Sequence, residues 1–346
     1  MVRKNSEPAI IHVDFVKSHE IVYSHQVSQK ILGTQMFFNL YLTEKDYQIK
    51  AKILQGSKLV GEELDIKNGV KPYEKGKGIP AQTATTLKEK PFTSETKIDE
   101  TFSPLIGGSY FHRYRITWNN DYWIKYGEWL AAPRDKSTFE AEEKLIFRQT
   151  SDSIIGSFIG KGYIMRNNTH IILKKDDTYN LKYVLACLNS KLLNYYYWTI
   201  NPEKGEAMAE VKAFHLGLLP IKRIDHEDQQ PFVALADKML TLNQQLQQKR
   251  NRFLRRLSEN IEGIKITTVL QTFDQMDFAG FLAELKKQKI KLSLVQQDEW
   301  EDYFNDYRSA CQQLSTQIAQ TDAEIDRKVF DLYGLTDEER AVVSVK

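Results

Sequence analysis

The strongest constraint on the fold lies after Asp225, where apolar residues recur at alternating four- and three-residue steps in two long segments. This spacing puts one narrow apolar seam on each of two helices, as in helices that pack along their length. The seams are Phe232, Leu235, Met239, Leu242, Leu246, Phe253 and Leu257, then Trp300, Tyr303, Tyr307, Ala310, Leu314, Ile318, Ile325 and Val329. Ile264 to Leu294 returns the chain, so residues 225–346 are expected to form a long antiparallel helical arm that resembles a coiled coil.

The part before the arm has the composition of a folded domain. The 346 residues are 41% hydrophobic and 11% aromatic, which is enough to fill more than one core. No apolar run approaches eighteen residues, and His12 and Asp14 interrupt the apolar start, so neither a membrane span nor a signal peptide is expected. Cys187 and Cys311 stand alone, without a CxxC pair. These features predict a cytoplasmic protein.

Short strand-like runs alternate with polar turns over residues 59–224. Strands are expected in LVGEELDI, LIFR, SIIGSFI, GYIMR and THIILKK, and RYRITW and YWIKY are expected to form a hairpin around Asn119-Asn120-Asp121. Thr138 to Lys144 is expected as a short helix, and Asn180 to Trp198 as one buried helix. The predicted fold class is therefore α+β: a mixed, β-rich domain with packed helices, followed by the arm.

Residues 1–58 are interpreted as a connector from an upstream catalytic region. VSQKILGTQMFFNLYL is apolar at helical spacing, and YQIKAKIL alternates in the manner of a strand. The expected domain boundaries are thus 1–58, 59–224 and 225–346.

The basic excess lies in the first two thirds of the chain, and lysines cluster there in one loop. Residues 1–222 hold 31 Lys and Arg against 25 Asp and Glu, and seven lysines fall between Lys67 and Lys97, where Gly and Pro exclude a long helix. Such a loop suits phosphate contact, and solvated lysines are the alternative. The phosphate-binding candidates are Lys71, Tyr73, Lys75, Lys77, Lys136 and Lys204. The cluster from Arg250 to Arg256 is a weaker candidate.

Arg, Asn and Gln at strand ends are candidates for reading base edges, because a rigid scaffold must present such groups in a groove. Alternation predicts Tyr114, Ile116 and Trp118 on a core face, and Arg113, Arg115 and Thr117 on a basic face; surface ion pairing is the alternative. The base-reading candidates are Arg113, Arg115, Arg134, Arg148, Gln149, Arg166, Asn167, Asn168 and His170. The run from Tyr195 to Trp198 is more typical of packing than of base stacking.

Catalytic alternatives find weaker support in the sequence. Asp135, Glu142 and Lys144 loosely match a metal-dependent nuclease, although the pattern falls in helix-forming sequence. No Gly-rich S-adenosylmethionine turn, NPP[YF] tetrapeptide or P-loop is present, and the histidines lack metal-ligand spacing. No catalytic or metal-binding residue is therefore predicted. A scaffold that binds a protein through the arm remains a further alternative.

Several blocks occur in an order that carries a family resemblance: GVKPYEKGKG, FHRYR, YWIKYGEWLAAPRD, LIFRQTSDSIIGSF, YNLKYVLACLNSKLLNYYY, EVKAFHLGLLPI and DLYGLTDEE. From Leu59 onward the chain resembles the TaqI-like C-terminal specificity domain, the target-recognition region of type IIG restriction-modification enzymes and adenine-specific DNA methyltransferases. It is more distantly similar to type I specificity subunits. The family pattern LLRGxDIHRY is here LIGGSYFHRY, with Gly107 at the usual basic position, which suggests an individual specificity.

The resemblance implies a module that reads a short asymmetric duplex site. Its expected partners are double-stranded DNA and a methyltransferase, often with a nuclease, in the same polypeptide or on a second one. S-adenosylmethionine and Mg²⁺ would belong to that enzyme, and no cofactor is expected in this chain. The arm would set the distance and angle between reader and catalyst.

Overall fold

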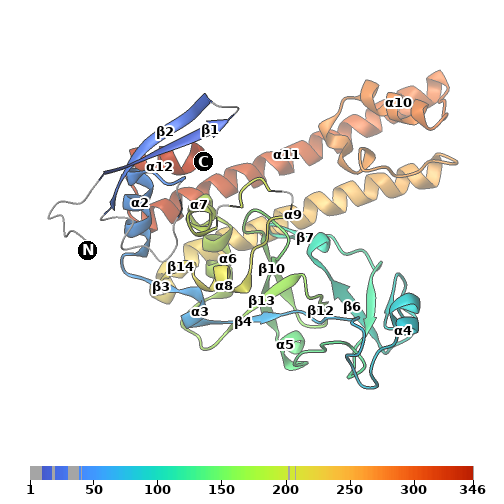
Figure 1. Ribbon diagram of the computed structural model, residues 1–346. Helices are drawn as coiled ribbons and strands as arrows, with labels where there is room; N and C mark the ends of the chain where they lie inside the picture. The colour runs from blue at the N-terminus through green and yellow to red at the C-terminus, as the bar shows by residue number, and fades with distance from the viewer. Residues whose placement is uncertain are drawn as a thin grey trace.

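The structure is a computed structural model that describes residues 10–17, 20–29, 39, 41–201, 203–206 and 208–345. A β-rich body lies beneath a long two-helix arm, and a hairpin of β1 (Ile10–Lys17) and β2 (Glu20–Ser28) lies at the end of the body away from the arm tip (Figure 1). The predicted α+β class is confirmed. No helix among the described residues is long and apolar enough to cross a membrane.

The central sheet has the order β11-β10-β13-β4, and all its neighbouring strands are antiparallel. Its strands are β4 (Leu64–Asn68), β10 (Glu143–Arg148), β11 (Gly156–Gly160) and β13 (Thr169–Lys174). Leu145 and Phe147 of β10 enter the core beneath the helices, whereas Ile146 enters the core shared with a second sheet. Both faces of β10 are covered, which explains its continuous apolar run.

The second sheet has the order β12-β6-β9-β5. It consists of β5 (Thr93–Ser94), β6 (Phe102–Ile106), β9 (Trp123–Lys125) and β12 (Ile164–Met165), with β12 parallel to β6. The strands predicted at GYIMR and THIILKK are confirmed as β12 and β13. The sheet is built from distant segments, since β12 joins β6 across about sixty residues of chain.

The hairpin predicted between RYRITW and YWIKY is wrong. RYRITW supplies β8 (Arg115–Ile116), which pairs with β7 (Phe111–His112), while β9 pairs with β5 and β6. The turn between β7 and β8 is Arg113-Tyr114, and Tyr114 has a φ of 58°. This left-handed residue breaks the assumed alternation, and the Tyr114 ring is buried in the helix-side core.

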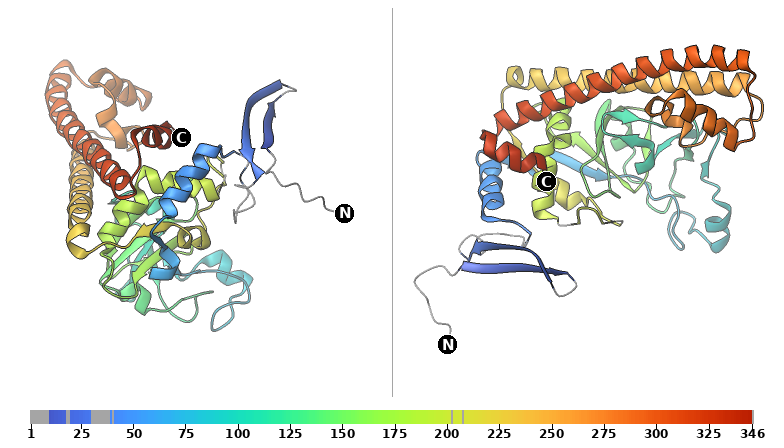
Figure 2. Two further views of the ribbon diagram at one scale, coloured as in Figure 1. Left: turned by 90° about the vertical axis from the view of Figure 1, so that its left-hand side faces the viewer. Right: turned by 90° about the horizontal axis from the view of Figure 1, so that it is seen from above.

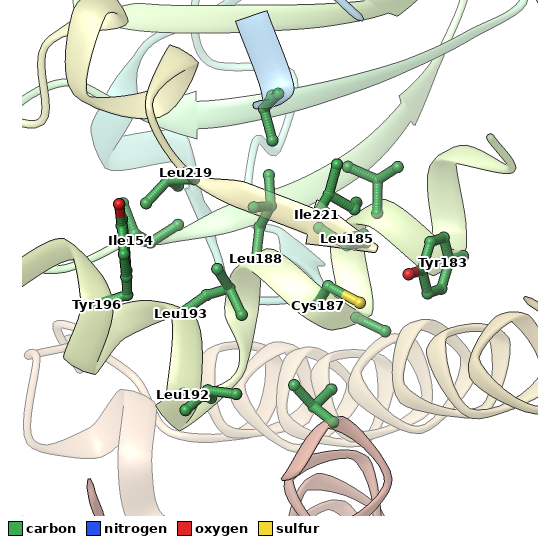
Figure 3. Close-up of a cluster of buried hydrophobic side chains, with 14 of the residues drawn as sticks. Ile154, Tyr183, Leu185, Cys187, Leu188, Leu192, Leu193, Tyr196, Leu219 and Ile221 are labelled. Carbon is green, nitrogen blue, oxygen red and sulfur yellow. The ribbon is translucent and has the colours of Figure 1, made fainter. Parts of the chain in front are cut away.

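Two helices replace the single one predicted for Asn180 to Trp198: α6 (Leu181–Asn189) and α7 (Lys191–Ile200). Ser190 separates them because its extended backbone ends α6 while its hydroxyl accepts from Leu193 N to cap α7. Side chains from both helices pack against Leu219 and Ile221 (Figure 3). Ile221 lies on β14 (Pro220–Lys222), which pairs with β3 (Ser57–Leu59).

Four short helices lie in segments whose structure was predicted differently or not at all. The lysine-rich stretch contains α4 (Ala84–Glu89), and α5 (Ser137–Glu140) ends before Lys144, which belongs to β10. LVGEELDI forms a short helix, α3 (Val60–Glu63), before β4, and α8 (Ala213–Gly217) precedes β14.

The strand predicted at YQIKAKIL is wrong, because this segment lies in α2 (Glu44–Leu54). Thr43 and Asp46 form a capping box, and Tyr47, Lys50 and Ile53 bury one helical face, so capping and helical spacing outweigh the apparent alternation. The helix predicted upstream, at VSQKILGTQMFFNLYL, lies largely outside the described residues.

The seam predicted for the first arm helix is confirmed, whereas in the second helix Phe304 and Cys311 are the fully buried residues beside a predicted seam that is half-buried from Trp300 to Ile318. Helices α9 (His226–Asn260) and α11 (Leu294–Leu332), of 35 and 39 residues, run antiparallel and side by side (Figures 1 and 2). At the tip, η2 (Leu270–Gln275) and α10 (Phe278–Lys287) enclose an aromatic core around Phe253. After α11, the chain turns back through α12 (Asp337–Val345), which packs on α7.

Candidate nucleic-acid interface

Arg148 ends strand β10 at the edge where β7 and β8 lie. Its Nε donates to the Phe111 carbonyl oxygen over 2.9 Å, and its Nη2 lies 3.1 Å from His112 Nδ1. The guanidinium therefore fixes β7 against the sheet and is itself held in one orientation. Both contacts join segments more than thirty-five residues apart.

Arg115, on β8, is a cation without an acidic partner. Its Nε is buried and lacks a hydrogen bond, and the guanidinium makes no ion pair with any described residue. Burial lowers the pKa of Arg115, and the charges of Arg250 and Arg148 lower it further. A partly buried, uncompensated cation beside other cations favours binding of an anion.

His112 lies close to the positive charges of Arg115 and Arg148. Burial, Arg115 and Arg148, in that order, lower the pKa of His112 from 6.5 to about 4. The imidazole is therefore neutral near pH 7. If its Nδ1 accepts from Arg148, its Nε2–H is a donor that can reach a base edge or a phosphate.

The turn between β12 and β13 brings Arg166, Asn167 and Asn168 to the same edge. Asn168 Oδ1 accepts from Gly108 N over 3.1 Å, while Arg166 N donates to Ile106 O over 2.8 Å. A Cβ on Gly107 would lie 3.9 Å from Arg166 Cδ, so the exposed Arg166 side chain occupies the space next to this glycine. Arg166 thus places a cation next to position 107 from a neighbouring turn.

Like Arg148 and Asn168, three further base-reading candidates have partners within the protein. Arg113 forms an ion pair with Asp322, and its Nη2 lies 2.6 Å from the carboxylate. His170 is buried, with Nδ1 and Nε2 each 2.8 Å from an oxygen, of Asn68 and Val211 respectively. Gln149 Nε2 lies 3.5 Å from Glu210 Oε1. Their roles on DNA stay predictions, but each side chain would first have to leave its partner.

Arg134 has a different position. It is exposed, it has a φ of 63°, and its Nε makes a long contact of 3.4 Å to Gly69 O. Gly69 immediately follows β4, so Arg134 extends the polar edge on the side of the lysine loop.

Some of the phosphate-binding lysine candidates already contact an acidic or aromatic side chain of the protein. Lys71 pairs with Glu74 over 2.7 Å, Lys136 pairs with Glu140 over 3.1 Å, and Lys204 Nζ lies 3.8 Å from the centre of the Trp198 ring. Lys75 and Lys77 are exposed and make no ion pair within the described part of the chain.

Tyr73 belongs to the support of this loop. Its hydroxyl accepts from Phe92 N over 2.7 Å, and its ring stacks on Phe92. The loop is further held by Gln82, whose Nε2 donates to the carbonyl oxygens of Pro72 and Trp129.

The three residues of the nuclease alternative do not converge. Asp135 accepts from Ser137 N, and Glu142 pairs with Lys161 over 2.7 Å. Lys144 is buried, and its ammonium donates to the carbonyl oxygens of Phe139, Ala141 and Gly160 over 2.7–2.8 Å. No cluster of His, Cys, Asp or Glu suited to a metal occurs among the residues that the structure describes.

Sequence reasoning missed His112 and ranked Arg113 as a base reader. Strand alternation put Arg113 outward, but the left-handed Tyr114 makes this pair a turn and directs Arg113 to the arm. The pairing of His112 with Arg115 across β7 and β8 brings these two side chains together instead. The FHRYR block contains His112, Arg113 and Arg115. Only the geometry of the turn shows that Arg113 contacts the arm while His112 and Arg115 pair across the strands.

The structure thus has an α+β body with arginines and asparagines from several strand ends at one edge, joined to a long antiparallel arm. Residues 103–221 match the family model of the TaqI-like C-terminal specificity domain, which supports a role in DNA target recognition. The predicted family is thereby confirmed. Residues 225–329 match a second family model, a domain of unknown function, DUF8810.

Two solved structures share low similarity with the chain. One is the type IIL restriction-modification enzyme MmeI in complex with DNA, at 13% identity and a TM-score of 0.35, covering 78% of this chain and 36% of that chain. The other is the HsdS subunit from Thermoanaerobacter tengcongensis, at 14% identity and a TM-score of 0.31, covering 71% of this chain and 50% of that one. This chain thus spans half or less of each. No curated protein matches it.

Proposed function

We propose that the chain reads a short asymmetric duplex sequence and positions it for adenine methylation, cleavage or both. The catalytic component, a methyltransferase or nuclease in the same polypeptide or on a partner, would supply the S-adenosylmethionine and Mg²⁺ chemistry. The observation that carries the proposal is the gathering of Arg115, Arg148 and Arg166 at one edge, with Arg115 lacking any acidic partner among the described residues.

The donors at this edge suit base edges in the major groove. An arginine guanidinium can donate two parallel hydrogen bonds to guanine, and an asparagine amide can pair with adenine, each worth about 1–3 kcal/mol of discrimination. Arg166, Asn167 and Asn168 lie on a turn whose backbone is hydrogen-bonded to Ile106, Val70 and Gln149. Because this turn is held from several sides, its side chains are presented at fixed positions.

The lysine loop supplies contacts that do not depend on sequence. Lys75 and Lys77 can approach phosphates from a loop whose backbone is held by Gln82. Such contacts release counterions, so binding weakens as salt rises, by a slope of about 0.9 per phosphate in log K against log salt.

The test is selection from a random duplex library with the full chain, followed by salt titration. A single enriched motif is expected, and Arg166→Ala should relax preference at one position, while Lys161→Ala, next to Glu142, should leave the motif unchanged. Absence of any enriched motif would overturn the proposal. If the chain instead captures a methyltransferase domain without binding duplex, the scaffold alternative is favoured.

A further inference from the structure

A cleft of about 1000 Å³ lies between the arm and the part of the body from Ser109 to Asp121, called here the recognition edge. Strands β7 and β8 form one wall, and His112 and Arg115 line the cleft from this side. The arm forms the other wall, with Arg252 and Arg255 of α9 and, nearer the tip, Thr272 of η2. Figure 1 shows α9 running above this part of the body toward α10.

The cleft has a strong excess of positive charge. Arg115 and Arg252 make no ion pair with any residue in the described ranges, and Arg255 lies 3.8 Å from Glu259. Arg250 also lines the cleft, but Asp274 neutralises it through hydrogen bonds of 2.8 and 2.7 Å. Asp121 is the one carboxylate among the described residues that line the cleft, and it accepts from Asn119 N. The cations of the two walls are close enough for Arg250 to lower the pKa of Arg115.

The polar face of α9 is oriented by its apolar seam. Gln248, Arg252 and Arg255 follow one another by four and three residues, so they share one face of the helix. Phe253 and Leu257 are buried in the arm core, which fixes the rotation of the helix. Gln248, Arg252 and Arg255 all line the cleft, and Gln248 and Arg252 also border a groove shared with α11.

One ion pair holds the arm wall together, and another joins the body to the arm. The buried pair of Arg250 and Asp274 joins α9 to η2 within the arm. The pair of Arg113 and Asp322 joins the β7–β8 turn to α11. The opening between the walls is consequently a feature of the folded chain and does not require a movement to form.

We propose that the arm is the second wall of the DNA-binding cleft, with Arg252 and Arg255 contacting phosphates of the duplex whose bases face the recognition edge. This inference rests on the proposed function and gives the segment 225–329 a role in binding beyond spacing. Duplex DNA is the occupant because the two walls present cations to a polyanion, while one of them also carries the donors suited to bases.

The first experiment reverses charge on the arm. Arg252→Glu/Arg255→Glu is compared with Arg327→Glu/Lys328→Glu, a change of equal charge on α11 at residues that do not line the cleft. The cleft variant should bind random duplex at least tenfold more weakly at low salt and lose about 1.8 from the salt slope, at about 0.9 per phosphate. The control should retain the wild-type affinity and slope.

The outcomes separate this inference from the proposed function. If wild type selects a motif and the cleft variant binds duplex as tightly as wild type, the arm is not a wall of the site and the proposed function stands. If wild type binds no duplex at all, the proposed function fails and the inference fails with it.

A crosslinking experiment covers the case in which the charge-reversed variant does not fold. Both native cysteines are buried, so Ser258→Cys on the cleft face and Ala323→Cys on α11 each add one exposed thiol. An azidophenacyl group on residue 258 should crosslink to bound duplex, and the same group on residue 323 should not. Equal crosslinking at both positions, or none at 258 while duplex is bound, would overturn the inference.

Discussion

Arg113 and Asp322 are 209 residues apart in sequence and form an ion pair with two hydrogen bonds, of 2.6 and 3.1 Å. The pair connects the turn between β7 and β8 to α11, so it links the body to the arm. Lys191 adds a second link from α7, since its backbone N–H donates to Asp326 Oδ1 over 2.8 Å.

Removal of Arg113 should therefore loosen the arm from the body. Arg113→Ala leaves Asp322 unpaired beside Asp326, whose pKa is raised first by burial. A loss of about 1–3 kcal/mol in the free energy of unfolding is expected, because an unpaired carboxylate remains partly buried. Urea unfolding measures this, and Arg113→Ala/Asp322→Ala should recover part of the loss. Additive losses in the double variant would contradict a direct interaction.

Lysines of the loop between Lys67 and Lys97 should contribute unequally to duplex binding. Lys75→Ala/Lys77→Ala should weaken duplex binding for all sequences alike and lower the salt slope by about 1.8, because two phosphate contacts are lost. Lys71→Ala should change the slope less, since Glu74 already neutralises this lysine at 2.7 Å. Fluorescence anisotropy across a salt series tests both. A larger effect at Lys71 would show that DNA displaces Glu74.

The two neighbouring glycines should respond differently to arginine. A Cβ on Gly107 meets only side-chain atoms, with Asn168 Oδ1 at 3.4 Å, so Gly107→Arg should fold and add a cation beside Arg166. Gly108→Arg brings its Cβ to 3.3 Å from the Asn168 backbone oxygen, which cannot swing aside. Thermal melting should show the greater destabilisation for Gly108→Arg, and library selection should show an altered motif only for Gly107→Arg. Equal melting temperatures would contradict this packing.

His112 should titrate well below an ordinary histidine. Its folded pKa of about 4 lies under the unfolded value of about 6.5. The unfolded state therefore binds more protons between these values, and the contribution of His112 to stability is lost as pH falls through this window. NMR of the ring C–H follows the titration directly. Arg115→Ala removes a nearby positive charge and should raise the midpoint, and an unchanged midpoint would place Arg115 away from the imidazole.

Lys144 should act as a structural support. Its ammonium is buried and donates to three carbonyl oxygens, so Lys144→Met should remove this donor from all three. A loss of about 2–4 kcal/mol in the free energy of unfolding is expected. Lys161→Met, which removes an exposed partner of Glu142, is the control and should change stability by less than about 1 kcal/mol.

The arm and the buried strands could be predicted because their signals are local. A seam from Phe232 to Leu257 and an apolar run such as LIFR each depend on neighbours within a few turns or residues. The hairpin prediction failed because one left-handed residue, Tyr114, ends the alternation, and periodicity carries no information about backbone φ. The cleft could not be predicted, because it joins Arg115 to Arg252 across 137 positions, and long-range packing has no local pattern.

The apolar seams also limit how the arm can change in length. Adding one residue to α9 before Arg252 would rotate the arginine face by about 100° and move it about 1.5 Å along the axis, while also taking the seam out of register with α11. Only paired insertions of about seven residues, one in each helix, keep the arginine face in its direction and the seams of α9 and α11 in register. Each such step moves the tip by about 10 Å, roughly the rise of three base pairs of duplex. The arm can therefore change in length only in steps of about seven residues per helix, and the helical repeat sets the size of each step.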